Sequence, residues 1–266
     1  MKLVSIITPS YNQAAYLEQT LRSVLEQDYP QLEYFVADGG STDGSLEIIQ
    51  RYAPRLAWWV SEKDSGQADA VNKGFARASG EIIGWLNSDD LYEPGCIARA
   101  AGLFEQHPEA ALVCGDVRSI DGDGQAINIM RFDDWSLPDL LAFNIISQPG
   151  VFIRRSALEK TGYLDLSYHY LLDHQLWLRV LQHGSLIYTP VIQASARFHA
   201  AAKNVAHAAE FGREAFRIVD WMQTQPALQP LFAQHRRRIL AGAQRMNARY
   251  LLDGGLNAKA LSHYLK

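Results

Sequence analysis

The sequence predicts an α/β protein with a mostly parallel central sheet and helices on both faces. Short apolar runs alternate with amphipathic segments of helical period through the first ninety residues, which is the pattern of βαβ units. The apolar runs at 3–8, 32–37 and 82–86 each end in a polar cluster. Because ligands of open α/β sheets bind outside the carboxyl ends of the strands, these clusters predict one site at one sheet edge.

Each element of this first part follows from its local pattern. We expect strands at 3–8, 32–37, 56–60 and 82–86, and helices at 15–27, around 46–52 and at 67–78. Ser65 is a candidate cap for the last of these helices.

The second part of the chain is predicted to be mixed. We expect helices at 95–106 and 173–183, and short strands at 111–114, 117–120, 126–131, 151–153, 187–189 and 193–198. Beyond residue 204 two amphipathic helices are expected, separated by a break at Pro226 and Pro230. These patterns predict a domain over 1–202 and a helical extension over 203–266.

Composition excludes several classes of protein. Hydrophobic residues make up 48% of the 266 positions and charged residues 20%, as in an ordinary globular protein. Cys96 and Cys114 show neither a disulfide framework nor metal-ligand spacing. No apolar run approaches the roughly 18 residues of a spanning helix, and Met1-Lys2 leads directly into a strand. We therefore expect a cytoplasmic protein.

The charge is unevenly distributed. The net charge of −4 divides into +6 for residues 203–266 and −10 for residues 1–202. A basic helical extension behind an acidic body can contact anionic lipid at the inner face of the membrane, or a protein partner. A solvated helix face explains the same charges. No nucleic-acid partner is expected, and the sequence leaves oligomerisation open.

Two common phosphate-binding motifs are missing, because neither GxGxxG nor GxxxxGK[ST] occurs. Asp89 and Asp90, directly after the strand at 82–86, offer another solution. Paired carboxylates suit a hard divalent cation, which neutralises diphosphate oxygens. An Asp-Asp pair is also common in solvated turns.

Other polar residues at this edge suit a nucleotide. Asp38 can accept a hydrogen bond from a base N–H, although an Asp before two glycines is also a turn former. Pro9 and Tyr11 can pack against the base of such a nucleotide. The segment 62–74 brings further polar side chains to a helix N-terminus, which favours an anion. They are Gln67, Asp69, Asn72 and Lys73.

The chain resembles the inverting glycosyltransferases of family 2, which have the GT-A fold, and in particular bacterial enzymes that build surface polysaccharide. The resemblance covers about residues 3–200. The segments that carry it are Thr8–Asn12, Asp38–Gly44, Gly66–Gly74, Leu86–Asp90 and Leu172–Arg179. It implies transfer from a nucleoside-diphosphate sugar, with UDP the usual carrier, to a saccharide or lipid-linked saccharide, using Mn²⁺ or Mg²⁺.

The resemblance also implies residue roles. Asp38 would bind the base, and Asp89 and Asp90 would serve the ribose, the diphosphate and the metal. His199 matches a histidine that approaches the metal or the diphosphate. Asp173 matches the general base, because a single displacement needs one group to take the proton of the acceptor hydroxyl. An N-cap is the alternative role for Asp173.

The sequence departs from the family pattern at three positions. Asn87 replaces a common Asp, Leu172 stands where an acidic residue often precedes the base, and Gln175 replaces a frequent Asp. The absence of Gln-x-x-Arg-Trp favours one transfer per binding event over processive synthesis. Gln148-Pro149-Gly150 is a candidate acceptor-site segment or a turn. A sugar-nucleotide-binding protein without turnover and a metal-dependent nucleotidyltransferase are the alternatives.

Overall fold

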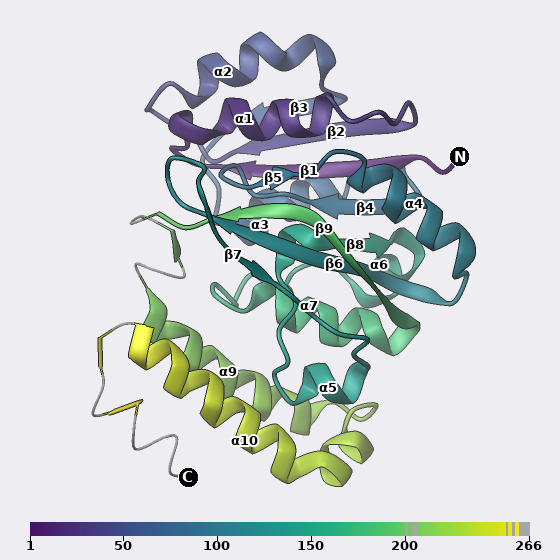
Figure 1. Ribbon diagram of the computed structural model, residues 1–266, viewed down its shortest axis with the longest axis vertical. Coiled ribbons are helices and arrows are strands. Elements are labelled where there is room, and N and C mark those ends of the chain that lie inside the picture. The colour runs from purple at the N-terminus through teal and green to yellow at the C-terminus, as the bar shows by residue number, and fades with distance from the viewer. Residues whose placement is uncertain (200–201, 204–206, 254, 257–258, 261–266) are drawn as a thin grey trace.

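The structure, a computed structural model, describes residues 1–199, 202–203, 207–253, 255–256 and 259–260 (Figure 1). Its strands are β1 Val4–Ser10, β2 Leu32–Asp38, β3 Trp58–Ser61, β4 Ile82–Trp85, β5 Leu91–Tyr92, β6 Ala110–Ile120, β7 Ala126–Met130, β8 Val151–Arg154 and β9 Ser185–Arg197. Its α-helices are α1 Ala14–Leu25, α2 Ser45–Tyr52, α3 Gln67–Phe75, α4 Cys96–Gln106, α5 Leu137–Leu141, α6 Arg155–Thr161, α7 Leu172–Val180, α9 Ala208–Thr224 and α10 Gln229–Asp253. Short 3₁₀ turns occupy Ala53–Arg55, Gln148–Gly150 and Leu181–His183.

In the described residues these strands form one sheet in the order β3-β2-β1-β4-β8-β6-β9-β5, with β7 added to β6. The strands β1 to β4 are parallel, as are β6 and β9. Strands β8, β5 and β7 pair with their neighbours in the antiparallel direction. The α/β class predicted from the sequence is confirmed.

Helices cover both faces of the sheet (Figure 1). Side chains of β1 alternate between the two faces, so Ile6 packs with α1, α2 and α4, whereas Ile7 packs with α3 and α7. Both isoleucines are fully buried. The sheet thereby separates two apolar layers, and its central strand β1 is buried on both faces, as parallel strands in α/β proteins are.

Two predicted strand pairs are single long strands in the structure. The runs at 111–114 and 117–120 lie within β6, and those at 187–189 and 193–198 fall in β9, which ends at Arg197. The pairing register of β6 with β9 shifts near Gly115. A Cβ at Gly115 would overlap Val191 and Gln193, so the glycine lets a bulged segment of β9 pass closely. The interruption in the apolar pattern therefore marks a β-bulge and not the end of one strand and the start of another.

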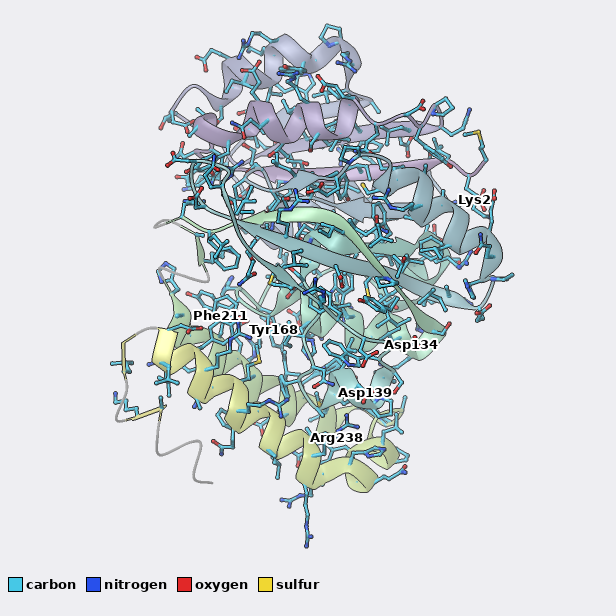
Figure 2. All side chains as sticks on the ribbon, in the orientation of Figure 1. Lys2, Asp134, Asp139, Tyr168, Phe211 and Arg238 are labelled. Atoms are coloured by element: carbon cyan, nitrogen blue, oxygen red, sulfur yellow. The ribbon has the colours of Figure 1, made fainter. Side chains whose placement is uncertain are left out.

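The C-terminal helices α9 and α10 lie side by side below α5 and α7 (Figure 1). Their buried stripe belongs to the same apolar cluster as the residues of α3 and α7. Arg238 of α10 forms an ion pair with Asp139 of α5, and Figure 2 labels both residues in the lower part of the molecule. The two helices are therefore docked on the α/β body. The domain boundary near residue 202 stays a prediction.

Candidate active site

Three strand ends meet at one level of the sheet edge. The pairing of β1 with β2 places Ser10 beside Asp38, and the pairing of β2 with β3 places Asp38 beside Ser61. On the other side of β1, Ile7 pairs with Trp85, so the segment 86–90 leaves the sheet at the same edge. The structure thus brings together the polar clusters that the sequence placed after separate strands.

Asp38 is 2% exposed and organises the turn that follows β2. Its Oδ2 accepts hydrogen bonds from the backbone N–H of Gly40 at 3.1 Å and of Ser41 at 2.9 Å. The Ser61 hydroxyl donates to the same oxygen at 2.7 Å, and the Ser41 hydroxyl donates to Oδ1. Oδ1, with a single protein donor, is the oxygen that retains capacity for a ligand N–H.

Tyr11 lies beside this turn, and its side chain is 63% exposed. A Cβ on Gly39 would come within 3.2 Å of the Tyr11 ring and 2.8 Å of Asp64 Oδ2, so the glycine backbone lies between those two side chains. Pro9 is buried at the end of β1. An exposed aromatic ring next to bare backbone is suited to stacking on a planar base.

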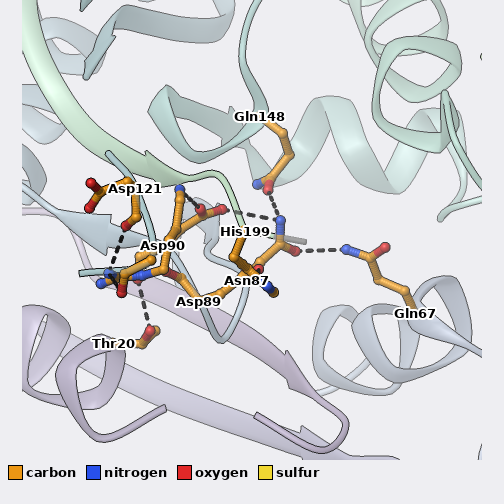
Figure 3. A network of polar contacts seen from close by, with 10 residues as sticks. Thr20, Gln67, Asn87, Asp89, Asp90, Asp121, Gln148 and His199 are labelled. Atoms are coloured by element: carbon orange, nitrogen blue, oxygen red, sulfur yellow. Dashed lines mark hydrogen bonds and ion pairs between the residues drawn. The ribbon is translucent and has the colours of Figure 1, made fainter. Parts of the chain in front are cut away.

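Asn87 is the centre of an amide network (Figure 3). Its Oδ1 accepts from Gln67 Nε2 at 2.7 Å and from the Trp85 indole N–H at 2.9 Å. Its Nδ2 donates to Gln148 Oε1 at 3.0 Å and to Asp90 Oδ2 at 3.3 Å. An Asp at position 87 would place a carboxylate beside Asp90 and lose both donated bonds. The asparagine that replaces the family's Asp at position 87 is therefore held by hydrogen bonds that suit an amide.

Asp90 points inward and Asp89 points toward His199. Asp90 is 6% exposed, and its Oδ1 accepts the Arg197 backbone N–H at 2.9 Å. Burial, followed by repulsion from Asp89, raises the pKa of Asp90 well above its usual value. His199 Nε2 lies 3.1 Å from Asp89 Oδ2. The guanidinium of Arg197 braces this corner through the carbonyl oxygens of residues 89, 121 and 122.

The residues at this corner fit a divalent cation that takes its remaining ligands from a diphosphate and water. Mg²⁺ is commonly held by one or two carboxylates plus substrate phosphates. Asp89 and His199 supply one carboxylate and one imidazole at the rim of the network (Figure 3). The Asp90 carboxylate contacts protein donors here, so its role as a direct ligand stays a prediction. Within the described residues no group of three or more His, Cys, Asp or Glu side chains could hold a metal alone.

Helix α3 sends its polar side chains to different places. Gln67 joins the Asn87 network, whereas Asp69 Oδ2 accepts the Ser65 backbone N–H at 3.0 Å. The N-cap residue of the helix is Gly66, and no side chain caps it, so the predicted Ser65 cap is wrong. Lys73 Nζ pairs with Glu62 at 2.8 Å and lies 3.7 Å from Asp69.

Asn72, on the same helix, binds both backbone groups of Leu164. Its Nδ2 donates to the Leu164 carbonyl and its Oδ1 accepts the Leu164 N–H, each at 2.9 Å. Both ends of the amide are thus engaged with the segment that leads to α7. The predicted ligand contacts of Asp69, Asn72 and Lys73 stay predictions.

Asp173 is half-buried in the first turn of α7, and its Oδ1 accepts the His174 N–H at 2.7 Å. Burial raises the pKa of Asp173 to about 6; the Glu214 carboxylate raises it further and the Lys203 ammonium opposes the shift. Such a carboxylate is ionised at neutral pH and is basic enough to accept a proton.

Lys203 connects this carboxylate to the Asn87 network. Its Nζ donates to Gln67 Oε1 at 2.7 Å and to the His169 carbonyl at 3.2 Å. Partial desolvation of its ammonium lowers the pKa of Lys203, although the side chain as a whole is exposed, and the carboxylates of Glu214, Asp173 and Asp89 oppose that shift. Electrostatic attraction to Lys203 is therefore common to Asp173 and Asp89.

Lys203 and Glu214 were not among the predicted site residues, because both lie in the predicted extension. Glu214 did carry a signal. It follows Phe211 by three positions and precedes Ile218 by four, so it lies on the apolar stripe of α9, where a charge needs a partner. Lys203 had no comparable local pattern.

The family model described as Glycosyl transferase family 2 matches residues 5–162. The chain is 33% identical over 199 residues to a PGL/p-HBAD biosynthesis glycosyltransferase of Mycobacterium bovis, covering 73% of this chain and 76% of that one. It is 32% identical over 191 residues to the putative teichuronic acid biosynthesis glycosyltransferase TuaG of Bacillus subtilis, covering 70% and 75%. The chain belongs to glycosyltransferase family 2. The predicted resemblance is confirmed.

Solved structures share the fold. S. aureus TarS 1–349 in complex with UDP-GlcNAc superposes with a TM-score of 0.70 at 16% identity, over 98% of this chain and 89% of that chain. The mannosyltransferase PcManGT of Pyrobaculum calidifontis, in complex with GDP-Man and Mn²⁺, gives 0.64 at 23% identity, over 100% and 81%. The GT-A fold predicted from the sequence is confirmed, with the two C-terminal helices added to it.

The match to other relatives is partial. The chain spans 65% of the length of an uncharacterized glycosyltransferase of Rickettsia typhi and 54% of one from Nostoc sp.. Across the described residues, every helix lacks the combination of length and apolar composition needed to traverse a bilayer.

Proposed function

We propose that the chain transfers a sugar from a UDP-sugar to a hydroxyl group of a saccharide or lipid-linked saccharide, with inversion at the anomeric carbon. The observation that carries this proposal is the position of Asp173. It is a half-buried carboxylate whose pKa is raised to about 6. Lys203, which binds the His169 carbonyl just before α7, also binds Gln67 of the Asn87 network. One acid stands at the metal corner and another, separate in sequence, is available as a base.

The donor would lie along the sheet edge. Tyr11 and Pro9 would border the base, with Asp38 Oδ1 accepting a base N–H. Bound Mn²⁺ or Mg²⁺ would neutralise the diphosphate as it leaves. Asp89 and His199 would hold that ion. The amide network centred on Asn87 would keep Gln67 and Asp90 in place beside it.

Asp173 would take the proton of the acceptor hydroxyl as its oxygen attacks the anomeric carbon. The bond from that carbon to the diphosphate oxygen breaks in the same step, and the diphosphate leaves with the electron pair. Attack from the face opposite the leaving group inverts the configuration. A general base of this kind contributes about 10²- to 10⁴-fold in rate.

The test begins with a panel of nucleoside-diphosphate sugars, measured by thermal shift with and without Mn²⁺ and then by nucleoside-diphosphate release with saccharide acceptors. Donors that bind raise the melting temperature in proportion to the logarithm of concentration over Kd. Asp173→Asn is expected to bind the donor normally and to lose turnover. Asp220→Asn, on the exposed side of α9, is the matched control.

The results separate the alternatives. Donor binding without turnover in the wild type would support a sugar-nucleotide-binding protein, and release of pyrophosphate would support a nucleotidyltransferase. Product with the donor's anomeric configuration would contradict inversion.

The basic face of α10 would bring the enzyme to an acceptor at the inner face of the membrane. Arg236 and Arg237 are exposed on this helix, and a basic side chain near an anionic surface contributes about 1 kcal/mol. The full-length double variant Arg236→Glu/Arg237→Glu should float less than the wild type with phosphatidylglycerol liposomes. Equal flotation of the two proteins would remove the membrane contact from the proposal.

A further inference from the structure

The segment that leads into α7 is held from three helices. Asn72 of α3 binds the backbone of Leu164, and Arg179 of α7 donates to the carbonyl oxygens of residues 161–163. Arg217 of α9 donates to the carbonyl and hydroxyl oxygens of Ser167. Its guanidinium also lies 4.2 Å from the ring centroid of Tyr168. Residues 161–168 are thus fixed mainly through their backbone groups, with added contacts to the Ser167 and Tyr168 side chains.

Glu214 holds the remaining part of this segment. Its Oε1 accepts the His169 N–H at 2.7 Å, and its Oε2 accepts the N–H groups of Tyr170 at 2.8 Å and Leu171 at 2.7 Å. Three consecutive backbone donors therefore converge on one carboxylate. Leu171 directly precedes α7, so the negative charge also lies at the positive end of the α7 dipole.

The carboxylate is itself fixed. Glu214 is 8% exposed, and Phe211, Ala215 and Ile218 bury the same side of α9 in the apolar cluster shared with α7. Without Glu214 the three N–H groups would lack their acceptor, and the Leu171 N–H is buried, where an unmade hydrogen bond is costly. The loop would have to move to reach water.

Asp173 is two residues beyond the last amide that Glu214 binds. A displacement of residues 169–171 therefore passes directly into the first turn of α7. The charged and titratable groups that face Asp173 are Lys203, Glu214 of α9 and Tyr250 of α10. Tyr250 stays neutral near pH 7, because burial raises its pKa to about 12.

We infer that Glu214 is a positioning residue that fixes the backbone of residues 169–171 and thereby sets the orientation of Asp173 toward the acceptor hydroxyl. The inference rests on the proposed role of Asp173. It makes α9 a functional part of the active site. A shift of the order of 1 Å in such a group costs about 10²-fold in rate.

The test compares Glu214→Gln with Glu210→Gln. Both changes lie on α9, one turn apart, and both remove one carboxylate, but Glu210 pairs with the exposed Arg213. For Glu214→Gln we expect kcat to fall about 10²-fold with the donor KM unchanged. The acidic midpoint of the pH–rate profile should move to lower pH, because a repelling charge near Asp173 is gone. Glu210→Gln should match the wild type in kcat, in donor KM and in the acidic midpoint.

Hydrogen exchange provides a readout that needs no substrate. Amides 169–171 should exchange faster in Glu214→Gln than in the wild type or in Glu210→Gln, at equal overall melting temperature. Unchanged exchange there would overturn the inference, as would an unchanged kcat or a loss confined to donor KM. A wild type without turnover for any donor would refute the proposed function, and faster exchange in Glu214→Gln would then still support the backbone clamp.

Discussion

Lys203 Nζ lies 2.7 Å from Gln67 Oε1, and so one ammonium group joins the Asn87 network to the segment that carries Asp173. The same group donates to the His169 carbonyl, whose own residue is held by Glu214. The Asn87 network and the segment that leads to Asp173 are therefore linked through one cation. This relationship makes the electrostatic state of Asp173 dependent on a residue outside the α/β body.

Lys203→Met should move the acidic limb of the pH–rate profile to higher pH. The cation lowers the pKa of Asp173, so its removal leaves more of this carboxyl protonated at a given pH. On the acidic limb, a rise of 1 in the pKa of Asp173 lowers the rate about tenfold. Initial rates between pH 5 and 8 would measure the midpoint. Lys160→Met, which removes an exposed charge on α6, is the control. Identical midpoints in both variants would contradict the assignment.

The wild-type rate should itself fall below about pH 6. Asp173 accepts a proton only when ionised, and burial raises its pKa to about 6. The rate is expected to rise through that value and to be level above it. The contribution of Asp173 to the free energy of unfolding changes with pH in the opposite direction to the rate. Between pH 6 and 4 the native state binds a proton that the unfolded chain does not, so this contribution grows as the pH falls.

Asp173→Asn isolates that contribution. Thermal unfolding of wild type and variant at pH 7 and pH 4.5 would show the wild type gaining relative to the variant at the lower pH. An equal difference at both values would indicate that Asp173 has an ordinary pKa.

The sequence predicted that these polar residues would meet at one sheet edge because they follow strands. Asp38, Asn87 and Asp89 each come directly after an apolar run, and parallel pairing then forces them to one edge. The α/β class followed from the same alternation. Asp173 came from the family resemblance, since its local pattern also fits a helix cap.

The remaining parts of the site depend on long-range contacts that no local pattern encodes. Lys203 meets Gln67 across 136 positions, and Arg197 meets Asp90 across 107. The same reason explains the bulge at Gly115, which is set by the partner strand. For Asp38 the sequence leaves two roles open, a turn former and an acceptor for a base N–H. The structure shows the turn hydrogen bonds at Oδ2, and Oδ1 keeps the capacity to accept a further bond.

His174 gives an opposite pH effect one residue from Asp173. It is 1% exposed, and its ring centroid lies 5.4 Å from that of Phe143. Among the described residues neither ring nitrogen makes a well-formed hydrogen bond, although the Leu140 backbone weakly favours the protonated ring. Burial lowers the pKa of His174 to about 4. Between pH 6.5 and 4 the unfolded chain binds a proton that the native state does not, so stability decreases as the pH falls. At pH 5 this loss is about 2 kcal/mol relative to pH 7.5.

His174→Phe should abolish that loss and make the protein less sensitive to acid. Denaturant unfolding at pH 7.5 and pH 5 would measure the two differences. His183→Phe, at an exposed histidine beyond the end of α7, should leave the wild-type sensitivity intact. A His174→Phe protein that loses as much stability as wild type would show that His174 is protonated in the native state.

The contact of α10 with α5 depends on Gly242. A Cβ at this position would overlap the Ala142 carbonyl, and backbone cannot yield as a flexible side chain does. Gly242→Val should therefore destabilise the fold by about 1–3 kcal/mol. Ala241→Val is the control, since position 241 is exposed and a valine introduced there carries only a helix-propensity cost of up to about 0.7 kcal/mol. Because α10 packs along α9, a displaced α10 also loosens the support of Glu214. Amides 169–171 should then exchange faster in Gly242→Val than in Ala241→Val, and equal exchange in the two variants would show that α9 keeps its place without α10.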